Sequence, residues 1–318
     1  MHPVIDELLD LVAEDSLPAA HTSSHWREDG REIVVERRAH ELCLRPKSFE
    51  TVSPMGRVWR SLSVVERYSY RPVTARFKRY PEVWQAATQL ARDLTGGPHY
   101  NFNVFKSACA LSVLADHWEA GGLHPMTFAM IGDGCGFLSA LIRRWLPTAK
   151  LYCLDLPKTL VFQAQTLGQA DPDATFAMLS SSHSSQGADA VFVPPQEVER
   201  ITEDIDCAIN IASMQEMTEF SINYYFTFLR RRSTPYSRFY CVNRLQKELR
   251  GGEVTQFERY PWRADDEIFL DGPCPYYTHY LAPWTDPAGP RVLGLRVPCV
   301  NSFLGVMRHR LVHLAPLL

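Results

Sequence analysis

The chain has 318 residues, long enough for one large domain with an appendage or for two domains, and its 46% hydrophobic and 22% charged content is typical of a globular protein. A formal net charge of −3 gives no electrostatic reason to expect a nucleic-acid partner or an anionic membrane surface. No stretch approaches the roughly 18 apolar residues of a membrane span, and the acidic N-terminal segment from Met1 to Glu7 is unlike a signal peptide.

The cysteines are dispersed rather than clustered. All eight lie far apart, without a CxxC pair or a Cys/His group at zinc spacing. Most lie in apolar runs, where a reduced cysteine packs as a small hydrophobic side chain. We therefore expect no metal site and a reducing, cytoplasmic location.

The first 98 residues are expected to be helical and connective. Apolar residues from Val4 to Val12 and from Trp84 to Leu94 have the spacing of amphipathic helices, and Gly96-Gly97-Pro98 ends the region. Such a region preceding a cofactor-binding fold is predicted to be a cap that covers the substrate or forms a homodimer contact. Residues 99–318 are predicted to form the cofactor-binding domain.

A polar segment precedes the next predicted helix, which runs from about Val104 to Trp118. The amide of Asn101 is a candidate contact for the amino-acid end of a nucleoside cofactor. Asn103 would serve equally well as the N-cap of the helix. Both interpretations of the segment are open.

The stretch from Thr127 to Asp155 predicts a strand, a glycine turn, a helix and a second strand that ends at an acid. The turn is Gly132-Asp133-Gly134-Cys135-Gly136, whose glycines allow a ligand to approach the backbone. The following helix N-terminus supplies free N–H groups, and a carboxylate at Asp155 can accept both hydroxyl hydrogens of a ribose. This pattern indicates a nucleoside cofactor, although it lacks the last glycine of the dinucleotide motif G-x-G-x-x-G. A glycine turn of an unrelated α/β protein is the alternative.

Further strands are predicted beyond this unit. Thr175–Leu179 is predicted as the third strand, ending at Ser180, a candidate contact for the adenine. Asp189–Val193 is an extra strand or a loop, and Asp206–Ala212 is the fourth, buried strand. This fourth strand runs directly into Ser213-Met214-Gln215-Glu216. Since ligands bind at the carboxyl ends of central parallel strands, this segment is predicted to lie at the mouth of the site.

The C-terminal part of the chain is predicted to complete the sheet. A helix over Ser221–Arg231 precedes a fifth strand at Phe239–Val242. Glu253–Tyr260 and Phe303–His313 alternate as late antiparallel strands do. The long segment Pro261–Pro298 between them is predicted to be a functional loop region.

Several motifs carry a resemblance to known families. The G-x-G-x-G turn, with Asp155 about 19 residues after it, resembles motif I and the following acidic position of class I S-adenosylmethionine (SAM) methyltransferases. From about Tyr100 to the C-terminus the chain resembles a bacterial family of sugar O-methyltransferases. The segments concerned are SMQEM at 213–217, YCVNRLQKEL at 240–249, ERYPW at 258–262 and DGPCPYY at 271–277.

The resemblance implies an α/β, Rossmann-like, seven-stranded class I methyltransferase sheet with an N-terminal helical cap. It also implies that the glycine turn and Asp155 hold SAM, while Gln215, Glu216 and Arg244 line the site. The candidate cofactor-binding residues are Gly132, Asp133, Gly134, Gly136, Asp155, Leu156, Ser180, Ser213, Gln215 and Asn101.

Methyl transfer to a hydroxyl group calls for a general base beside the acceptor oxygen. The candidate catalytic residues are Glu216, His279 and Tyr277, although Glu216 could also be an acid at a helix start and His279 an ordinary loop histidine. In the resembling family a Trp-His pair follows Cys-Pro in the last motif, whereas this chain has Tyr276-Tyr277. The identity of the base is therefore open.

The sequence favours a SAM-dependent O-methyltransferase that acts on a small molecule of sugar or specialised metabolism. One alternative is a cyclase in which the amine of SAM attacks its own γ-carbon, giving azetidine-2-carboxylate and methylthioadenosine. Aromatic walls around the sulfonium would suit that reaction through cation–π contacts. A second alternative is a SAM-binding module without catalytic activity.

Overall fold

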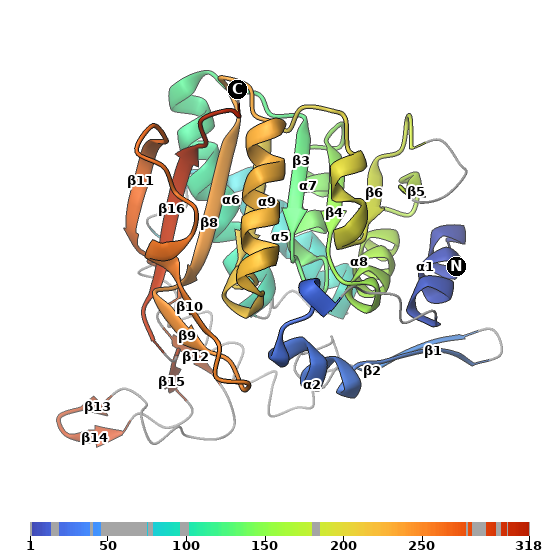
Figure 1. Cartoon of the computed structure of the whole chain (residues 1–318), viewed down its shortest axis with the longest axis horizontal. Helices are drawn as coiled ribbons and strands as arrows, with labels where there is room; N and C mark the ends of the chain where they lie inside the picture. Colours follow the sequence, from blue (N-terminus) through green and yellow to red (C-terminus); the bar gives the residue numbers. More distant parts are fainter. Residues whose placement is uncertain are drawn as a thin grey trace.

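A large β-sheet with helices on both faces forms the centre of the molecule (Figure 1). The computed structural model describes residues 2–13, 19–38, 41–45, 75, 79–95, 102–179, 185–277, 279–281, 291–296, 300–303 and 305–317. The sheet has eight strands in the order β11-β16-β8-β7-β3-β4-β6-β5. In chain order they are β3 (Thr127–Ile131), β4 (Lys150–Leu154), β5 (Phe176–Met178), β6 (Ala190–Val193), β7 (Cys207–Ile211), β8 (Arg238–Arg244), β11 (Glu267–Pro273) and β16 (Met307–His313). The predicted α/β, Rossmann-like class is confirmed, with eight strands where seven were expected.

The direction of the strands places a ligand site at one edge of the sheet. The neighbours from β5 to β8 all run parallel, whereas β16 is antiparallel to both β8 and β11. The chain leads from β3 to β4 on one side of β3, and later returns through β7 on the other side. The carboxyl ends of β3 and β7 therefore flank a topological switch point, the place where open α/β sheets bind ligands.

The two faces of the sheet bury alternate residues of β3. Phe128 and Met130 share a core with α6 (Phe102–Gly121), α7 (Phe137–Trp145) and α8 (Pro157–Ala170), while Ala129 and Ile131 share a second core with α9 (Glu219–Arg231). Burial on both faces explains why this strand is an unbroken apolar run in the sequence. Helices α6, α7 and α9 lie where the sequence predicts them.

Part of the N-terminal region departs from the prediction. The predicted helices are present as α1 (Pro3–Ala13), which packs on α8, and α5 (Pro81–Thr95), which packs on α6 and α7. Between them are a short 3₁₀ turn, η1 (Ala19–His21), a helix α2 (Ser24–Glu32), and an antiparallel hairpin formed by β1 (Val34–Arg38) and β2 (Glu41–Arg45). The expectation of a purely helical and connective region is therefore wrong at this hairpin.

Two short strands exchange the roles that the sequence suggested. β6 pairs with β4 and is buried along its whole length, whereas β5 pairs only with β6 and forms the edge of the sheet. The segment predicted as the third strand is thus an additional edge strand. The segment treated as an extra strand or loop, Asp189–Val193, holds the position beside β4 instead. A short 3₁₀ helix, η2 (Pro195–Arg200), follows β6.

The last part of the chain also requires a correction. Glu253–Tyr260 contributes β10 (Val254–Gln256), which pairs with β9 (Gln246–Glu248) outside the main sheet, and then the 3₁₀ turn η4 (Phe257–Arg259). The predicted loop region Pro261–Pro298 instead contains β11, which pairs with β16. The chain after β11 forms two further short antiparallel pairs, β12 (His279–Leu281) with β15 (Val300–Ser302), and β13 (Arg291–Val292) with β14 (Leu295–Arg296). The antiparallel strand predicted within Phe303–His313 is confirmed as β16.

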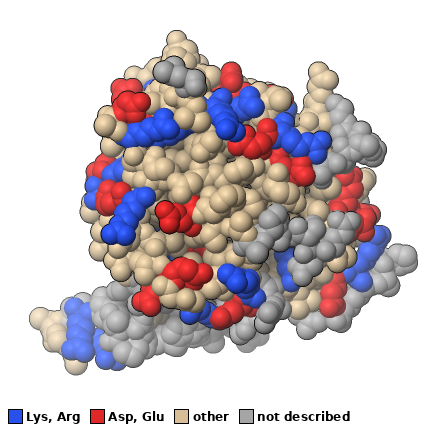
Figure 2. All heavy atoms as spheres, viewed as in Figure 1, with Lys and Arg blue, Asp and Glu red and all other residues tan. Residues whose placement is uncertain are grey.

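The described surface and helices add two observations. Basic and acidic side chains are interspersed over the face drawn in Figure 2. Among the helices of the described ranges, none has the length and apolar character needed to cross a lipid bilayer.

Candidate functional site

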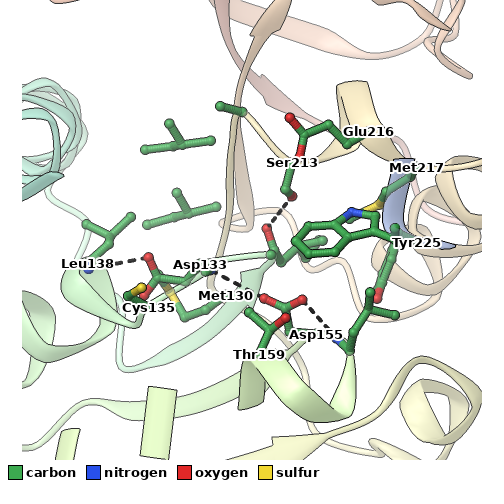
Figure 3. Close-up of a pocket in the computed structure, with 18 of the residues that line it drawn as sticks. Met130, Asp133, Cys135, Leu138, Asp155, Thr159, Ser213, Glu216, Met217 and Tyr225 are labelled. Atoms are coloured by element: carbon green, nitrogen blue, oxygen red, sulfur yellow. Dashed lines mark hydrogen bonds between the residues drawn. The ribbon is translucent and has the colours of Figure 1, made fainter. Parts of the chain in front are cut away.

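A cavity of about 360 Å³ lies at the carboxyl ends of β3, β4 and β7, at the switch point of the sheet (Figure 3). This volume is within the range that holds a drug-sized ligand. Its lining combines the glycine turn after β3, the start of α8, the loop after β7, and side chains from α2 and α6. The polar and aromatic members are His21, His25, Trp26, Asn103, Lys106, Ser107, Asp133, Phe137, Asp155, Thr159, Ser213, Glu216, Ser221 and Tyr225.

The glycine turn forms one wall of the cavity. Its backbone adopts conformations that favour glycine. Gly132, Gly134 and Gly136 have φ values of 69°, 62° and 79°. A Cβ atom on Gly132 would overlap the hydroxyl of Ser213. On Gly136 it would lie 2.9 Å from the backbone Cα of Gln163 in α8. Gly132 and Gly134 line the cavity, whereas Gly136 lies outside the lining and permits the close approach of α7 and α8.

Asp133 holds the start of α7. One of its carboxylate oxygens accepts hydrogen bonds from the backbone N–H (2.8 Å) and the hydroxyl (2.7 Å) of Ser139, and the other accepts from the N–H of Leu138 (3.4 Å). Burial raises the pKa of this carboxyl even though these hydrogen bonds favour its ionised form. The Asp133 side chain therefore stabilises the turn, and each of its carboxylate oxygens already accepts a hydrogen bond.

Asp155 lies at the end of β4 with its carboxylate facing the turn. It accepts hydrogen bonds from the N–H of Leu156 (2.8 Å), the N–H of Gly134 (3.3 Å) and the side-chain amide of Gln163 (2.7 Å). Burial raises its pKa to about 7, despite these donors. Beside it, the buried hydroxyl of Thr159 has no hydrogen-bond partner among the described residues. The cavity thus presents a buried carboxylate and a free hydroxyl next to each other, an arrangement suited to a ligand with hydroxyl groups.

The loop after β7 is held by a network of amides. The side-chain amide of Asn210 donates to the carbonyl of Ile131 (2.8 Å) and to the hydroxyl of Ser213 (2.5 Å), and Ser213 donates to the same carbonyl (3.1 Å). The residue between them, Ala212, has a φ of 62°, an uncommon conformation for a residue with a Cβ atom. Local backbone strain of this kind concentrates at functional sites.

Gln215 is buried and supports the loop. Its N–H donates to Asn243, its side-chain oxygen accepts from the N–H of Arg244 (2.9 Å), and its carbonyl accepts from the hydroxyl of Thr255 (2.8 Å). It does not line the cavity. The resemblance implies that Gln215 and Arg244 line the site, but both lie outside the lining of this cavity. The contact between them instead fixes the backbone of η3 (Met214–Glu216).

Glu216 lies inside the cavity and is paired with a lysine amine and an imidazole. Its Oε1 lies 2.5 Å from Nζ of Lys247, and its Oε2 lies 3.2 Å from Nε2 of His25. Burial raises its pKa, but the hydrogen bond to His25 and the charge of Lys247 outweigh that effect, so the pKa is lowered overall. Glu216 is thus held as a carboxylate, which makes it a weak proton acceptor.

Helix α2 closes one side of the cavity through contacts with this loop. The hydroxyl of Ser23 donates to the carbonyl of Glu216 (2.5 Å), and that of Thr218 donates to the carbonyl of Ala20 (2.7 Å). Ser23 also caps α2 by accepting a hydrogen bond from the N–H of Trp26. These contacts bring His21, His25 and Trp26 to the site, and no local sequence signal marked any of the three.

The remaining predicted residues have different outcomes. Tyr277 lies outside the lining, its ring centroid 5.3 Å from that of Phe102 and 4.9 Å from that of Phe303, and burial raises its pKa. The backbone of His279 lies in β12, but its side chain, like Asn101 and Ser180, falls outside the described residues. Asn103 is not an N-cap, since α6 begins at Phe102; it lines the cavity from the first turn of the helix.

Within the described ranges, no group of three or more His, Cys, Asp or Glu side chains is arranged to hold a metal ion. The cavity's thiol, Cys135, is buried, and burial raises its pKa to about 12. The other polar groups that line the cavity are carboxylates, imidazoles, hydroxyls, an amide and an amine.

Comparison with known proteins yields distant structural similarities. A scan of protein-family models finds no match, and a search of curated proteins finds none either. Among solved structures, the mitomycin 7-O-methyltransferase MmcR shares 14% identity at a TM-score of 0.38, over 97% of this chain and 83% of that one. The pyocyanin biosynthetic protein PhzM shares 14% at 0.39, over 78% and 61%.

A third similar structure is a SAM-dependent methyltransferase from Clostridium acetobutylicum, with 11% identity at a TM-score of 0.38, over 64% of this chain and 89% of that one. Similarities this distant assign neither a substrate nor a reaction to the present chain. The functional argument therefore rests on the cavity itself.

Proposed function

We propose that the protein binds SAM and transfers its methyl group to a hydroxyl oxygen of a small molecule. The observation that carries the proposal is one cavity in which the glycine turn and Asp155 face the His25–Glu216 pair. The glycine turn and Asp155 suit a nucleoside, and the His25–Glu216 pair suits removal of a proton from an acceptor. The residues before 99 are proposed to act as the cap, since α2 provides His25.

The residues present fit the nucleoside. The carboxylate of Asp155 accepts the ribose hydroxyls, and the unpartnered hydroxyl of Thr159 beside it gains a polar contact from the ligand. Gly132 and Gly134 both line the cavity, so the backbone of the turn is open to the rest of the molecule. When bound, SAM supplies a methyl group on a sulfonium, which is activated for displacement by an oxygen nucleophile.

The protein's own contribution is positioning and proton removal. Holding the two reactants together in line is the larger effect, because it turns a bimolecular step into an intramolecular one. His25 accepts the proton of the acceptor hydroxyl, and Glu216 orients the imidazole and stabilises the imidazolium that forms. The lowered pKa of Glu216 suits this supporting role better than that of the base itself.

The proposal is tested by a two-stage experiment. Isothermal titration calorimetry with S-adenosylhomocysteine (SAH), the product of methyl transfer, first measures nucleoside binding. Incubation with SAM and a panel of hydroxylated small molecules, with SAH quantified by mass spectrometry, then measures turnover. We expect SAH to accumulate only when an acceptor is present.

Variants identify the base. His25→Ala should lower kcat by about 100-fold or more, as is usual on removal of a general base, while the Kd for SAH changes little. His124→Ala, which alters an exposed histidine at the opposite end of β3, is the matched control and should leave both values unchanged. Methylthioadenosine formed from SAM alone would overturn the proposal in favour of the cyclase, and absence of SAH binding would overturn it altogether.

A further inference from the structure

Lys106 differs from the other charged residues of the cavity in having no partner. Asp133 caps α7, Asp155 accepts three hydrogen bonds, and Glu216 is paired with Lys247 and His25. Lys106, by contrast, makes no hydrogen bond or ion pair within the part of the chain that the structure describes. A half-buried ammonium group in this state has lost part of its hydration without gaining a counter-ion.

Lys106 shares the cavity with two of the loops that form the site. It belongs to the second turn of α6 and lines the cavity. Asp133, in the glycine turn, and Glu216, in the loop after β7, line the same cavity. Burial lowers the pKa of the Lys106 amine, and the carboxylates of Asp133 and Glu216 only partly offset that effect.

We propose that Lys106 binds a carboxylate in this part of the cavity, namely the carboxylate of the methionine arm of the cofactor; this inference rests on the proposed function. A carboxylate is the counter-ion that a lysine amine lacks here, and a charge-assisted hydrogen bond between the two is stronger than a neutral one.

The arrangement also sets the direction of the ligand. The ribose is anchored at Asp155, beside Gly134, and the amino-acid end is anchored at Lys106 of α6. The sulfur then lies between these two anchors. An ammonium that fixes the far end of a flexible arm reduces the number of arm conformations and so favours the one in which the methyl group is presented to the acceptor.

The test compares two ligands that differ only in the carboxylate. Isothermal titration calorimetry measures the Kd of SAH and of its decarboxylated analogue, S-adenosyl-3-thiopropylamine, with the wild type and with Lys106→Met. We expect the substitution to weaken SAH by about 10- to 100-fold, the usual range for loss of one partner of a desolvated charge pair, and to change the analogue by less than about threefold. Lys106→Arg should recover part of the affinity for SAH.

The controls separate this inference from the proposed function. Lys150→Met removes the same charge at the amino end of β4, where Lys150 pairs with Glu203, and should change neither Kd. Thermal unfolding of each variant checks that the fold is intact. An SAH affinity unchanged by Lys106→Met, or an equal loss for both ligands, overturns the role of Lys106, as does a loss confined to acceptor KM. A wild-type protein that binds neither ligand overturns the proposed function instead.

Discussion

Nε2 of His25 lies 3.2 Å from Oε2 of Glu216, although one residue belongs to the N-terminal helix α2 and the other to the loop after β7. Ser23 fixes the relationship by capping α2 and donating to the carbonyl of Glu216. The imidazole is thus positioned by a carboxylate that is itself kept ionised by Lys247. In the proposed mechanism Glu216 positions His25 and does not itself accept the proton. Substituting Glu216 should therefore lower kcat less than substituting the base.

Glu216→Gln should lower kcat by about 10- to 100-fold and leave the Kd for SAH within about threefold of the wild type. The amide keeps the size of the side chain but does not stabilise an imidazolium, so its effect falls on the chemical step rather than on nucleoside binding. Steady-state kinetics with an acceptor and calorimetry with SAH measure the two quantities.

A control for this prediction is Glu248→Gln, which removes an exposed carboxylate of β9 and should be silent. A kcat unaffected by Glu216→Gln would show that the carboxylate has no part in the chemistry.

Gly132→Ala should destabilise the protein and prevent cofactor binding. The new Cβ would overlap the hydroxyl of Ser213, and the backbone would have to keep a φ of 69° that costs a residue with a side chain about 1–2 kcal/mol. Gly187→Ala is the matched variant, since Gly187 has a φ of 83° but open space around it.

Denaturant unfolding and SAH calorimetry compare these two variants. The positive φ should lower the free energy of unfolding of both variants. Overpacking against Ser213 should lower that of Gly132→Ala by about a further 1–3 kcal/mol. Equal losses in the two variants, with SAH binding retained in both, would mean that the close packing against Ser213 is unimportant.

The sequence alone predicted those parts of the structure that depend on residues close together in the chain. The strand, glycine turn, helix and acid of Thr127–Asp155 are all present, because periodicity and glycine conformation depend on neighbouring residues. Pairing in the sheet depends on distant residues instead. β5 and β6 are both short and apolar, so only their partners distinguish an edge strand from an inner one.

Other features of the structure, among them β11 and the position of His25, could not be predicted from the sequence. β11 is half exposed and ends in Gly272-Pro273, so neither burial nor alternation marked it within a Pro- and Trp-rich segment. His25 reaches the site only because α2 docks against the loop after β7, a contact in which Ser23 and Glu216 are 193 positions apart in the sequence. The candidate base suggested by the structure was therefore outside the reach of motif analysis.

The affinity for SAH should rise as the pH increases from about 6 to about 8 and then level off. Burial raises the pKa of Asp155 to about 7, so its carboxylate becomes fully ionised only above neutral pH. Ribose hydroxyls donate to the ionised form and so bind it better. Calorimetry as a function of pH measures the rise, and Asp155→Asn should abolish it while weakening SAH at pH values above 7.

The free energy of unfolding of the ligand-free protein should fall, not rise, with increasing pH. The folded state retains the proton of Asp155 up to about pH 7, whereas the unfolded chain releases it near the ordinary value of 3.8, so folding becomes less favourable between these two values. Asp155→Asn lacks this ionisation and should gain stability relative to the wild type over that interval. A difference in Tm that is independent of pH would contradict the raised pKa.

Arg230 and Asp266 form the most deeply buried ion pair of the described residues, and its loss should be costly. Their side chains are 2% and 1% exposed, and the guanidinium donates to both carboxylate oxygens at 2.6 and 2.8 Å. The pair ties α9 to the segment before β11. Arg230→Met should reduce the free energy of unfolding by about 3–5 kcal/mol, because Asp266 is left as a buried charge without its partner.

The neighbouring pair provides the comparison for this last prediction. Arg231, the next residue of α9, pairs with Glu199 at 2.7 Å, but its side chain is 51% exposed. Arg231→Met removes the same charge in the same helical turn and should cost less than about 1 kcal/mol, since solvent screens an exposed pair. Urea unfolding of both variants measures the difference, and the SAH affinity of Arg230→Met at low temperature should remain that of the wild type. If the two variants unfold at the same denaturant concentration, burial does not govern the contribution of this pair.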